Sequence, residues 1–363
     1  MIDKINDLRN RLLANPRFRA AAGRLWPFNL IARRRARQLF DISAGFVYSQ
    51  VMMSCIELGW FERLRGGPCL LETLAADAGL AAPAAQRLAQ AAHALRLTEA
   101  RSGGRIALGP LGAAMIGDAG IAAMSSHHAL LYADMAAPLA LLRGENTNTQ
   151  LGEYWGYATS TAPELLAAER TKAYSELMAS SQPMIAEQVL TAFRFDAYEH
   201  VLDVGGGTGA FLSAVHARYP ALRRSLFDLP GVVAHMDPSM VDAPATKGGS
   251  FLDDDLPAGA DLISLVRIIH DHDDDVVLRL LTNIRRQIRP DATLLIAEPL
   301  AATRGAETVG DTYFGFYLLA MGSGKARTQE QIDALLAQSG FAPTRRHGTP
   351  VPLICSVLST NPI

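Results

Sequence analysis

The strongest constraint on the fold is a glycine-rich turn that follows a short apolar run. Residues 201–209 read VLDVGGGTG, and an amphipathic helix is expected directly after them, over Ala210–Tyr219. Glycines allow the backbone to turn tightly and to approach a ligand closely, and the first turn of a helix offers unpaired N–H groups. The pattern predicts a strand, a turn and a helix that together bind an anionic or carbonyl-rich group.

The rest of the C-terminal half alternates short β-rich runs with helical ones. That alternation predicts an α/β fold with a mostly parallel, doubly wound, Rossmann-like sheet that carries an antiparallel hairpin at one edge. Six strands are expected, at His200–Val204, Arg223–Leu229, Asp261–Ile269, Ala292–Glu298, Ala342–His347 and Leu353–Ser359. Ligands of such sheets bind at the carboxyl ends of the parallel strands.

The N-terminal half differs, because its apolar residues recur with helical spacing almost throughout. Within it, Leu74–Leu80 and Pro83–Leu97 read as two short helices, and Leu97–Leu108 reads as a hairpin that turns at Ser102–Gly104. Helix, helix and hairpin in this order are typical of a winged helix. The second helix carries only two arginines, whereas a recognition helix needs several polar and basic side chains. We therefore expect a scaffold or dimerisation role rather than DNA binding.

Length and composition agree with two folded domains. A chain of 363 residues exceeds what one hydrophobic core usually serves, and 49% apolar with 19% charged residues argues against disorder. We expect a mainly α-helical dimerisation domain over 1–190 and a ligand-binding catalytic domain over 191–363. The apolar stripe over Phe46–Met52 is wider than one small domain should bury, which predicts a homodimer.

Basic charge is concentrated at the N-terminus. Residues 1–40 hold ten of the 34 Lys and Arg residues but only two of the 36 Asp and Glu residues. A solvated helical face explains such a run, and attraction to an anionic membrane surface is the alternative. A net charge of −2 argues against a surface built for nucleic acid, and three scattered cysteines suit a reducing compartment. No apolar run approaches about 18 residues. We expect a cytoplasmic protein, with peripheral membrane contact left open.

Two cofactors compete for the glycine-rich turn, because residues 205–210 also satisfy the dinucleotide pattern Gly-x-Gly-x-x-Ala. Asp203 lies two residues before the first glycine, where a carboxylate would repel a pyrophosphate but can bind the ammonium end of S-adenosylmethionine. Asp228 ends the next expected strand and can accept hydrogen bonds from ribose hydroxyls of either cofactor; a surface aspartate before a turn is the alternative. Asp203 therefore favours S-adenosylmethionine, with a nicotinamide oxidoreductase as a rival.

One histidine and two carboxylates form the candidate catalytic group. His270 follows the apolar run Leu262–Ile269 and should lie at the carboxyl end of a parallel strand, where it can take a proton from a substrate. Asp271 is its neighbour, and Glu298 ends the following strand, where a carboxylate can fix the imidazole tautomer and stabilise imidazolium. The structural alternatives are a histidine at the start of a helix that begins at Asp273–Asp275, and a turn glutamate.

These residues resemble the class I small-molecule O-methyltransferases of the caffeate and acetylserotonin type, over nearly the whole chain. The resemblance is carried by residues 203–209 (DVGGGTG), 227–230 (FDLP), 270–271 (HD), Glu298 and 324–328 (GKART). It implies a helical dimerisation domain, a Rossmann-like catalytic domain and His270 as the base. Together with the motifs above, it predicts a cofactor site made of Asp203, Gly205, Gly207, Asp228, Leu229, Ser250, Phe251 and Arg267.

Within this family the chain is most similar to the carotenoid-pathway branch. The similarity lies in residues 32–37 (ARRRAR), 44–50 (AGFVYSQ), 141–145 (LLRGE), 174–178 (YSELM) and 265–267 (LVR). It implies a tertiary hydroxyl on a long polyene as the acceptor, with phenolic natural products as the alternative. Four positions depart from the family: Ser250 replaces an aspartate, Val266 a basic residue, His272 a tryptophan and Ala326 a second carboxylate. The change at Ala326 leaves Glu298 and Asp271 to support the base.

The acceptor pocket is expected to be largely apolar. Candidate lining residues are Met178, Phe314, Tyr317 and Met321. Apolar stripes of this kind equally serve as core. The paired His127 and His128 have no third ligand at metal spacing and are interpreted as structural.

A non-catalytic regulator is the rival function from another class. It would sense S-adenosylmethionine or an apolar ligand through the C-terminal half and act through the winged-helix-like part. The presence of both His270 and Glu298 disfavours that interpretation.

Overall fold

The computed structural model describes residues 2–117, 119–155, 181–236, 242–352 and 355–363. The chain forms two compact units, Met1–Gly117 and Asp118–Ile363. The boundary expected at residue 190 lies inside the second unit. Helices that precede it there, α9 (His128–Met135) and α11 (Gln150–Tyr154), pack against α17 (Gly315–Met321).

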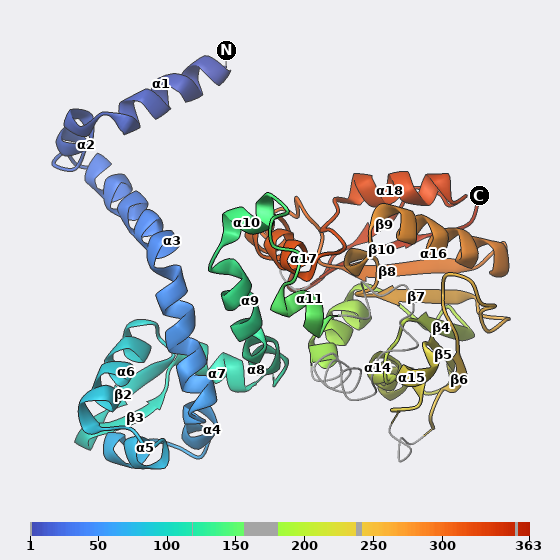
Figure 1. The fold of residues 1–363 in the computed structure, drawn as a ribbon, viewed down its shortest axis with the longest axis horizontal. Coiled ribbons are helices and arrows are strands. Elements are labelled where there is room, and N and C mark those ends of the chain that lie inside the picture. The colour runs from blue at the N-terminus through green and yellow to red at the C-terminus, as the bar shows by residue number, and fades with distance from the viewer. Residues whose placement is uncertain (1, 118, 156–180, 237–241, 353–354) are drawn as a thin grey trace. The chain divides into compact units, whose positions relative to one another are not determined.

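The first unit is helical with one small antiparallel sheet (Figure 1). Its helices are α1 (Ile2–Ala14), α2 (Pro16–Ala22), α3 (Phe28–Glu57), α4 (Trp60–Arg65), α5 (Leu71–Asp77), α6 (Ala82–Ala94) and α7 (Pro110–Ile116). Its strands are β1 (Cys69–Leu70), β2 (Thr98–Arg101) and β3 (Arg105–Leu108), in the order β1-β3-β2. The two helices and the hairpin expected between residues 74 and 108 are therefore present, with the hairpin turning at Ser102–Gly104.

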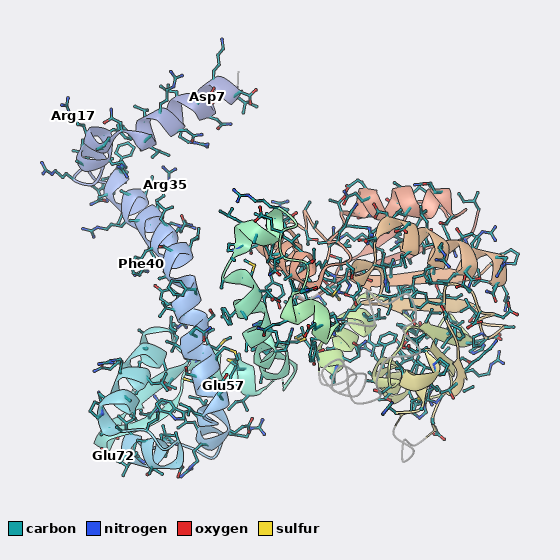
Figure 2. All side chains as sticks on the ribbon, viewed as in Figure 1. Asp7, Arg17, Arg35, Phe40, Glu57 and Glu72 are labelled. Carbon is teal, nitrogen blue, oxygen red and sulfur yellow. The ribbon has the colours of Figure 1, made fainter. Side chains whose placement is uncertain are left out.

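Most of the long helix α3 is solvent-exposed. Only Met53 and Cys55 near its C-terminal end are buried, and α1 and α2 bury no residue (Figure 2). By length and composition alone, α3 is long and apolar enough to cross a membrane, and only 11% of its most apolar stretch is buried in the structure. The sequence-based expectation that no segment approaches this threshold was therefore wrong for α3.

The second unit is built on a seven-stranded sheet in the order β6-β5-β4-β7-β8-β10-β9. The strands are β4 (His200–Val204), β5 (Arg223–Asp228), β6 (Ala245–Gly248), β7 (Leu262–Val266), β8 (Thr293–Glu298), β9 (Arg345–His347) and β10 (Ser356–Thr360). Strands β4 to β8 are parallel, and β10 is antiparallel to both β8 and β9. The mostly parallel sheet with an antiparallel edge hairpin is confirmed. Strand β6 was not predicted, because its exposed sequence ATKG lacks an apolar pattern.

The second unit also contains helices and short helical turns. They are α8 (Ala119–Ser126), α9, α10 (Pro138–Leu142), α11, a helical stretch over 181–192, α14 (Ala210–Arg218), α15 (Pro230–Val233), the 3-10 turn η3 (Ile269–Asp271), α16 (Asp274–Gln287), the π-helical turn η4 (Thr308–Phe314), α17 and α18 (Gln329–Gln338). Strands β4, β7 and β8 are buried throughout, because apolar clusters lie on both sheet faces. Polar residues within these three strands are therefore exceptions that need a reason. Asp203 and Glu298 are two of them.

Candidate active site

The glycine-rich turn joins β4 to α14 with a backbone that only glycine adopts easily. Gly205 has φ +73°, and an added Cβ would overlap the side chain of Ile268. At Gly206 an added Cβ would overlap the carboxylate of Asp203. At Gly205 and Gly206 the turn therefore passes so close to its surroundings that side chains are excluded, which leaves the backbone there free of side chains at the carboxyl end of β4.

Asp203 is a buried carboxylate with one unsatisfied oxygen. Its Oδ1 accepts a hydrogen bond from Ser264 Oγ at 2.6 Å, whereas Oδ2 has no partner among the described residues. Burial raises the pKa of Asp203 to about 7, although the Ser264 hydrogen bond opposes the shift. A buried acceptor without a donor is unfavourable, so this oxygen suits a cationic or N–H group of a ligand.

Asp228 ties the glycine-rich turn to the neighbouring strand. Its Oδ2 accepts from Gly207 N at 2.7 Å, and its Oδ1 accepts from Leu229 N at 2.7 Å. Desolvation raises the pKa of Asp228 to about 6, against the effect of these two hydrogen bonds. Each carboxylate oxygen keeps a second lone pair, so Asp228 can still accept from a pair of ribose hydroxyls.

Ser250 and Phe251 follow β6, the strand next to β5. Ser250 N donates to Asp254 Oδ2 at 2.7 Å, and Phe251 O accepts from Asn283 Nδ2 at 2.9 Å. The ring of Phe251 lies 5.5 Å from that of His272. The strand order thus brings the predicted cofactor residues that follow β4, β5 and β6 to one edge of the sheet.

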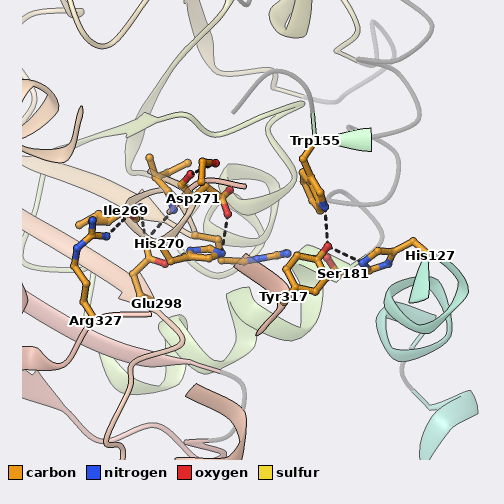
Figure 3. Close-up of polar contacts among 12 residues, drawn as sticks. His127, Trp155, Ser181, Ile269, His270, Asp271, Glu298, Tyr317 and Arg327 are labelled. Atoms are coloured by element: carbon orange, nitrogen blue, oxygen red, sulfur yellow. Dashed lines mark hydrogen bonds and ion pairs between the residues drawn. The ribbon is translucent and has the colours of Figure 1, made fainter. Parts of the chain in front are cut away.

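His270 lies on η3 rather than on strand β7, which ends at Val266. The expected strand to Ile269 is too long, because Glu298 Oε1 accepts from Ile268 N and Ile269 N at 2.8 and 2.7 Å and so replaces the strand ladder. Glu298 Oε2 accepts from His270 Nδ1 (Figure 3). One carboxylate from β8 therefore fixes both the turn and the imidazole that it carries.

The second nitrogen of His270 also faces a carboxylate. Nε2 lies 3.2 Å from Asp271 Oδ1 (Figure 3). Burial lowers the pKa of His270, but Asp271 and Glu298 outweigh burial, and the net direction is upward. Since carboxylates only accept hydrogen bonds, the resting geometry favours imidazolium, with both nitrogens donating. His270 must lose a proton before Nε2 can act as a base.

A loop on the other side of η3 holds the histidine turn in place. The Arg327 side chain is buried; its Nη1 donates to Ile269 O, its Nη2 to His272 O, and its Nε to Asp274 Oδ1, each at 2.8 Å. Lys325 N donates to His270 O at 2.9 Å. Sequence reasoning singled out residues 324–328 only through the family resemblance and gave Arg327 no role.

Of the predicted pocket residues, Phe314 lies beside His270. Its ring centroid is 5.8 Å from that of His270. Tyr317 is buried, and its hydroxyl accepts from Trp155 Nε1 at 2.8 Å and contacts His127 Nε2 at 2.7 Å (Figure 3). Met321 belongs to the apolar core around α17. Met178 lies outside the described residues.

Long-range polar contacts of aromatic residues were missed. His128 Nε2 lies 2.7 Å from Tyr313 OH, and burial lowers the pKa of His128, so its neutral form is favoured. Trp155 gave no signal in the sequence, because its partner Tyr317 is 162 positions away. Among the described residues, no group of three or more His, Cys, Asp or Glu residues could hold a metal ion.

Arg267 lies on the histidine side of the site. It has φ +61°, and its Nη1 donates to Ser181 Oγ at 2.9 Å. Its positive charge opposes the upward shift in the pKa of His270. No described hydrogen bond joins its side chain to the glycine-rich turn. Its predicted contact with a cofactor stays a prediction.

Comparison with known proteins identifies the family. A family described as an O-methyltransferase domain matches residues 139–342. The chain belongs to this O-methyltransferase family. It is 40% identical over 342 residues to demethylspheroidene O-methyltransferase of Cereibacter sphaeroides, a match that covers 92% of this chain and 88% of the relative.

Two solved structures share the fold. Human N-acetylserotonin methyltransferase in complex with SAM has a TM-score of 0.76 at 24% identity, with 90% of this chain and 97% of that chain covered. A methyltransferase of calicheamicin biosynthesis in its SAH-bound form has a TM-score of 0.72 at 26% identity, with coverages of 91% and 98%. The α/β methyltransferase fold with a helical N-terminal region is therefore confirmed.

The O-methyltransferase uses S-adenosylmethionine as its methyl donor. The described residues fit this cofactor. The unpartnered Asp203 Oδ2 suits its ammonium group, Gly205, Gly206 and Gly207 have no side chains to obstruct it, and Asp228 offers acceptors for its ribose. A pyrophosphate would instead meet the Asp203 carboxylate, which disfavours a nicotinamide cofactor.

Proposed function

We propose that this enzyme methylates the tertiary hydroxyl of an acyclic carotenoid. The observation that carries the proposal is the 40% identity, across 92% of the chain, to an enzyme named demethylspheroidene O-methyltransferase. An apolar acceptor also agrees with Phe314, whose ring lies next to His270. Phenolic natural products are the alternative acceptors.

His270 is the proposed general base, with Nε2 as the atom that accepts the hydroxyl proton. Glu298 on Nδ1 keeps the tautomer that leaves Nε2 available, and stabilises the imidazolium that forms. Such a base contributes about 10²–10⁴-fold. An aliphatic alcohol resembles water, with a pKa of about 15.7, far above about 6.5 for histidine. His270 therefore takes the proton during or after formation of the new O–C bond, and no free alkoxide forms.

The proposed cofactor site is the edge of the sheet formed after β4, β5 and β6. When bound, S-adenosylmethionine supplies an electrophilic methyl group on a positively charged sulfur. Asp203 Oδ2 binds the ammonium group, Asp228 binds the ribose hydroxyls, and the backbone of Gly205 and Gly207 approaches the cofactor without side chains. Leu229, Ser250 and Phe251 enclose the adenosine. Most of the rate acceleration then comes from holding the acceptor oxygen and the methyl group together, worth about 7–11 kcal/mol.

A methyl-transfer assay with two acceptor classes tests this function. Purified enzyme and S-adenosylmethionine are incubated with a detergent-dispersed hydroxylated acyclic carotenoid or with a set of phenols. Mass spectrometry should detect the gain of one methyl group on the carotenoid and no gain on the phenols. Methylation of phenols alone would show that the acceptors are aromatic natural products instead. Transfer to neither class, with intact cofactor binding and DNA binding in a gel shift, would favour the regulator.

We further propose that the enzyme is a cytoplasmic homodimer. Phe46 and Val47 on α3 are exposed, and an exposed apolar stripe on a folded unit favours burial against a second copy. The neighbouring α5, α6 and β2–β3 hairpin act as a winged-helix-like scaffold for this helix. The basic N-terminus is proposed to contact a membrane.

A further inference from the structure

We propose that the corner between α2 and α3 docks on an anionic lipid bilayer, with Trp26 inserted at the membrane–water interface. The inference rests on the proposed function in one respect: a long polyene acceptor is dissolved in membrane, so the enzyme gains from working at its surface. The surface itself is defined by the structure alone.

The corner presents large apolar side chains to solvent. Trp26 is 80% exposed, and Leu25 and Phe28 on either side are 59% and 55% exposed. Leu30 and Ile31 in the first turn of α3 are also exposed. An indole ring is amphipathic and prefers the headgroup level of a bilayer, so Trp26 is suited to this position.

Several cationic side chains lie close to these apolar residues in the sequence. Arg17 and Arg19 on α2, Arg24 in the corner, and Arg33 and Arg34 on α3 are all exposed. None of the five forms an ion pair with another residue in the described part of the chain. Figure 2 shows Arg17 and Arg35 near this N-terminal end of α3. Apolar residues within a cluster of unpaired arginines are complementary to an anionic lipid surface.

Two other arrangements are disfavoured. A second copy that packed its own residues 1–40 on this corner would place ten basic residues against ten of the same sign. A transmembrane α3 would remove Met53 and Cys55 from the folded unit in which they are buried. Docking on the bilayer surface would place the arginines beside anionic headgroups and the apolar side chains at the membrane–water interface.

The three tryptophans make the experiment specific. Trp60 and Trp155 are buried, at 1% and 4% exposure, so a change in tryptophan emission on adding vesicles reports on Trp26. We expect a blue shift and co-sedimentation with phosphatidylglycerol-containing vesicles, quenching by brominated lipid, and release at high salt because the attraction is screened. Pure phosphatidylcholine vesicles should bind much more weakly.

Matched variants separate the two contributions. Trp26→Ser should abolish the blue shift, and Arg33→Glu should weaken vesicle binding at least about fivefold, because each basic residue contributes to attraction. The controls are Leu70→Ser and Arg87→Glu, which change an exposed apolar and an exposed basic residue elsewhere in the first unit. Circular dichroism verifies that each variant is folded.

Three results would overturn the proposal. They are equal binding to neutral and anionic vesicles, binding that leaves Trp26 emission unchanged, and blue-shifted emission without lipid that shifts red on dilution, which would show that a second copy covers the corner. Vesicle binding uses neither acceptor nor cofactor, so it stands or falls separately from the catalytic proposal. Trp26→Ser should also keep full turnover on detergent-dispersed acceptor and lose it on acceptor held in vesicles.

Discussion

At the scale of single residues, the proposed role of His270 as a base conflicts with its surroundings. A base should be neutral, yet carboxylates face both of its nitrogens and raise its pKa. The same carboxylates stabilise the imidazolium that exists after proton transfer, so the site favours the product state of the base. The consequence is a pH requirement that experiments can measure.

Replacing His270 tests the base directly. His270→Ala should lower kcat at least 10²-fold while cofactor affinity stays within about twofold, because the described cofactor residues are on other strands. Steady-state kinetics together with calorimetry separate the two effects. If the variant keeps more than about a tenth of normal turnover, the proton leaves by another route and proximity alone carries the reaction.

The pH profile tests the carboxylates. Because the pKa of His270 is raised, kcat/KM should fall as pH decreases through a value above about 6.5, the ordinary histidine pKa. Glu298→Gln removes one cause of the increase, so the acidic limb should move to lower pH, with a smaller loss of maximal rate than in His270→Ala. An acidic limb that does not move would mean that the limb reports another group.

The proposed ribose contact of Asp228 gives a prediction for cofactor affinity. Asp228→Ala should weaken S-adenosylmethionine binding by about 3 kcal/mol, or two orders of magnitude, because charge-assisted hydrogen bonds to the ribose are lost. Calorimetry measures the change, with Asp291→Asn on the surface as a control. Affinity within twofold of the unchanged protein would remove Asp228 from the site.

At the scale of elements, the sequence predicted the strands that have an apolar pattern. It missed the strand without one and the strand end that is set by a polar side chain. Buried parallel strands are nearly continuous apolar runs, so β4 and β8 were predicted within one residue at each end. Strand β6 has no such run. The end of β7 depends on Glu298, about thirty positions away, and no local pattern records that contact.

The same distinction separates the residues of the candidate site that were predicted from those that were missed. Asp203, Asp228, His270 and Glu298 lie next to recognisable strands, so their positions followed from the motifs. Arg327 and Trp155 act through partners far away in the sequence, and only the fold brings them together.

Arg327 gives a prediction for the loop that holds η3. Arg327→Lys keeps the positive charge but cannot make the three directed contacts, so kcat should fall about tenfold and the acidic limb of the pH profile should move, with little change in cofactor affinity. Arg327→Ala should in addition destabilise the fold by about 3 kcal/mol. Arg289→Lys on the surface is the control. If Arg327→Lys is less stable but has a normal kcat and pH profile, the contacts of Arg327 serve stability alone.

At the scale of the whole molecule, the proposed dimer depends on α3. Replacing Phe46 and Val47 by serine should convert the protein to monomers, because two exposed apolar side chains would leave the interface. Sedimentation at micromolar concentration measures this, with Leu70→Ser as the control. A wild-type monomer in that experiment would contradict the dimer itself.

The carboxylate of Glu298 has a consequence for how this enzyme can change over evolutionary time. With the same two oxygens it ends strand β7, accepts two hydrogen bonds from the backbone around η3 and binds the imidazole of His270. A substitution that altered the chemistry at this position would also release two backbone N–H groups inside the protein. Descendants with new acceptors are therefore expected to vary the aromatic residues around Phe314 and to keep this glutamate, since fold and chemistry cannot be modified separately there.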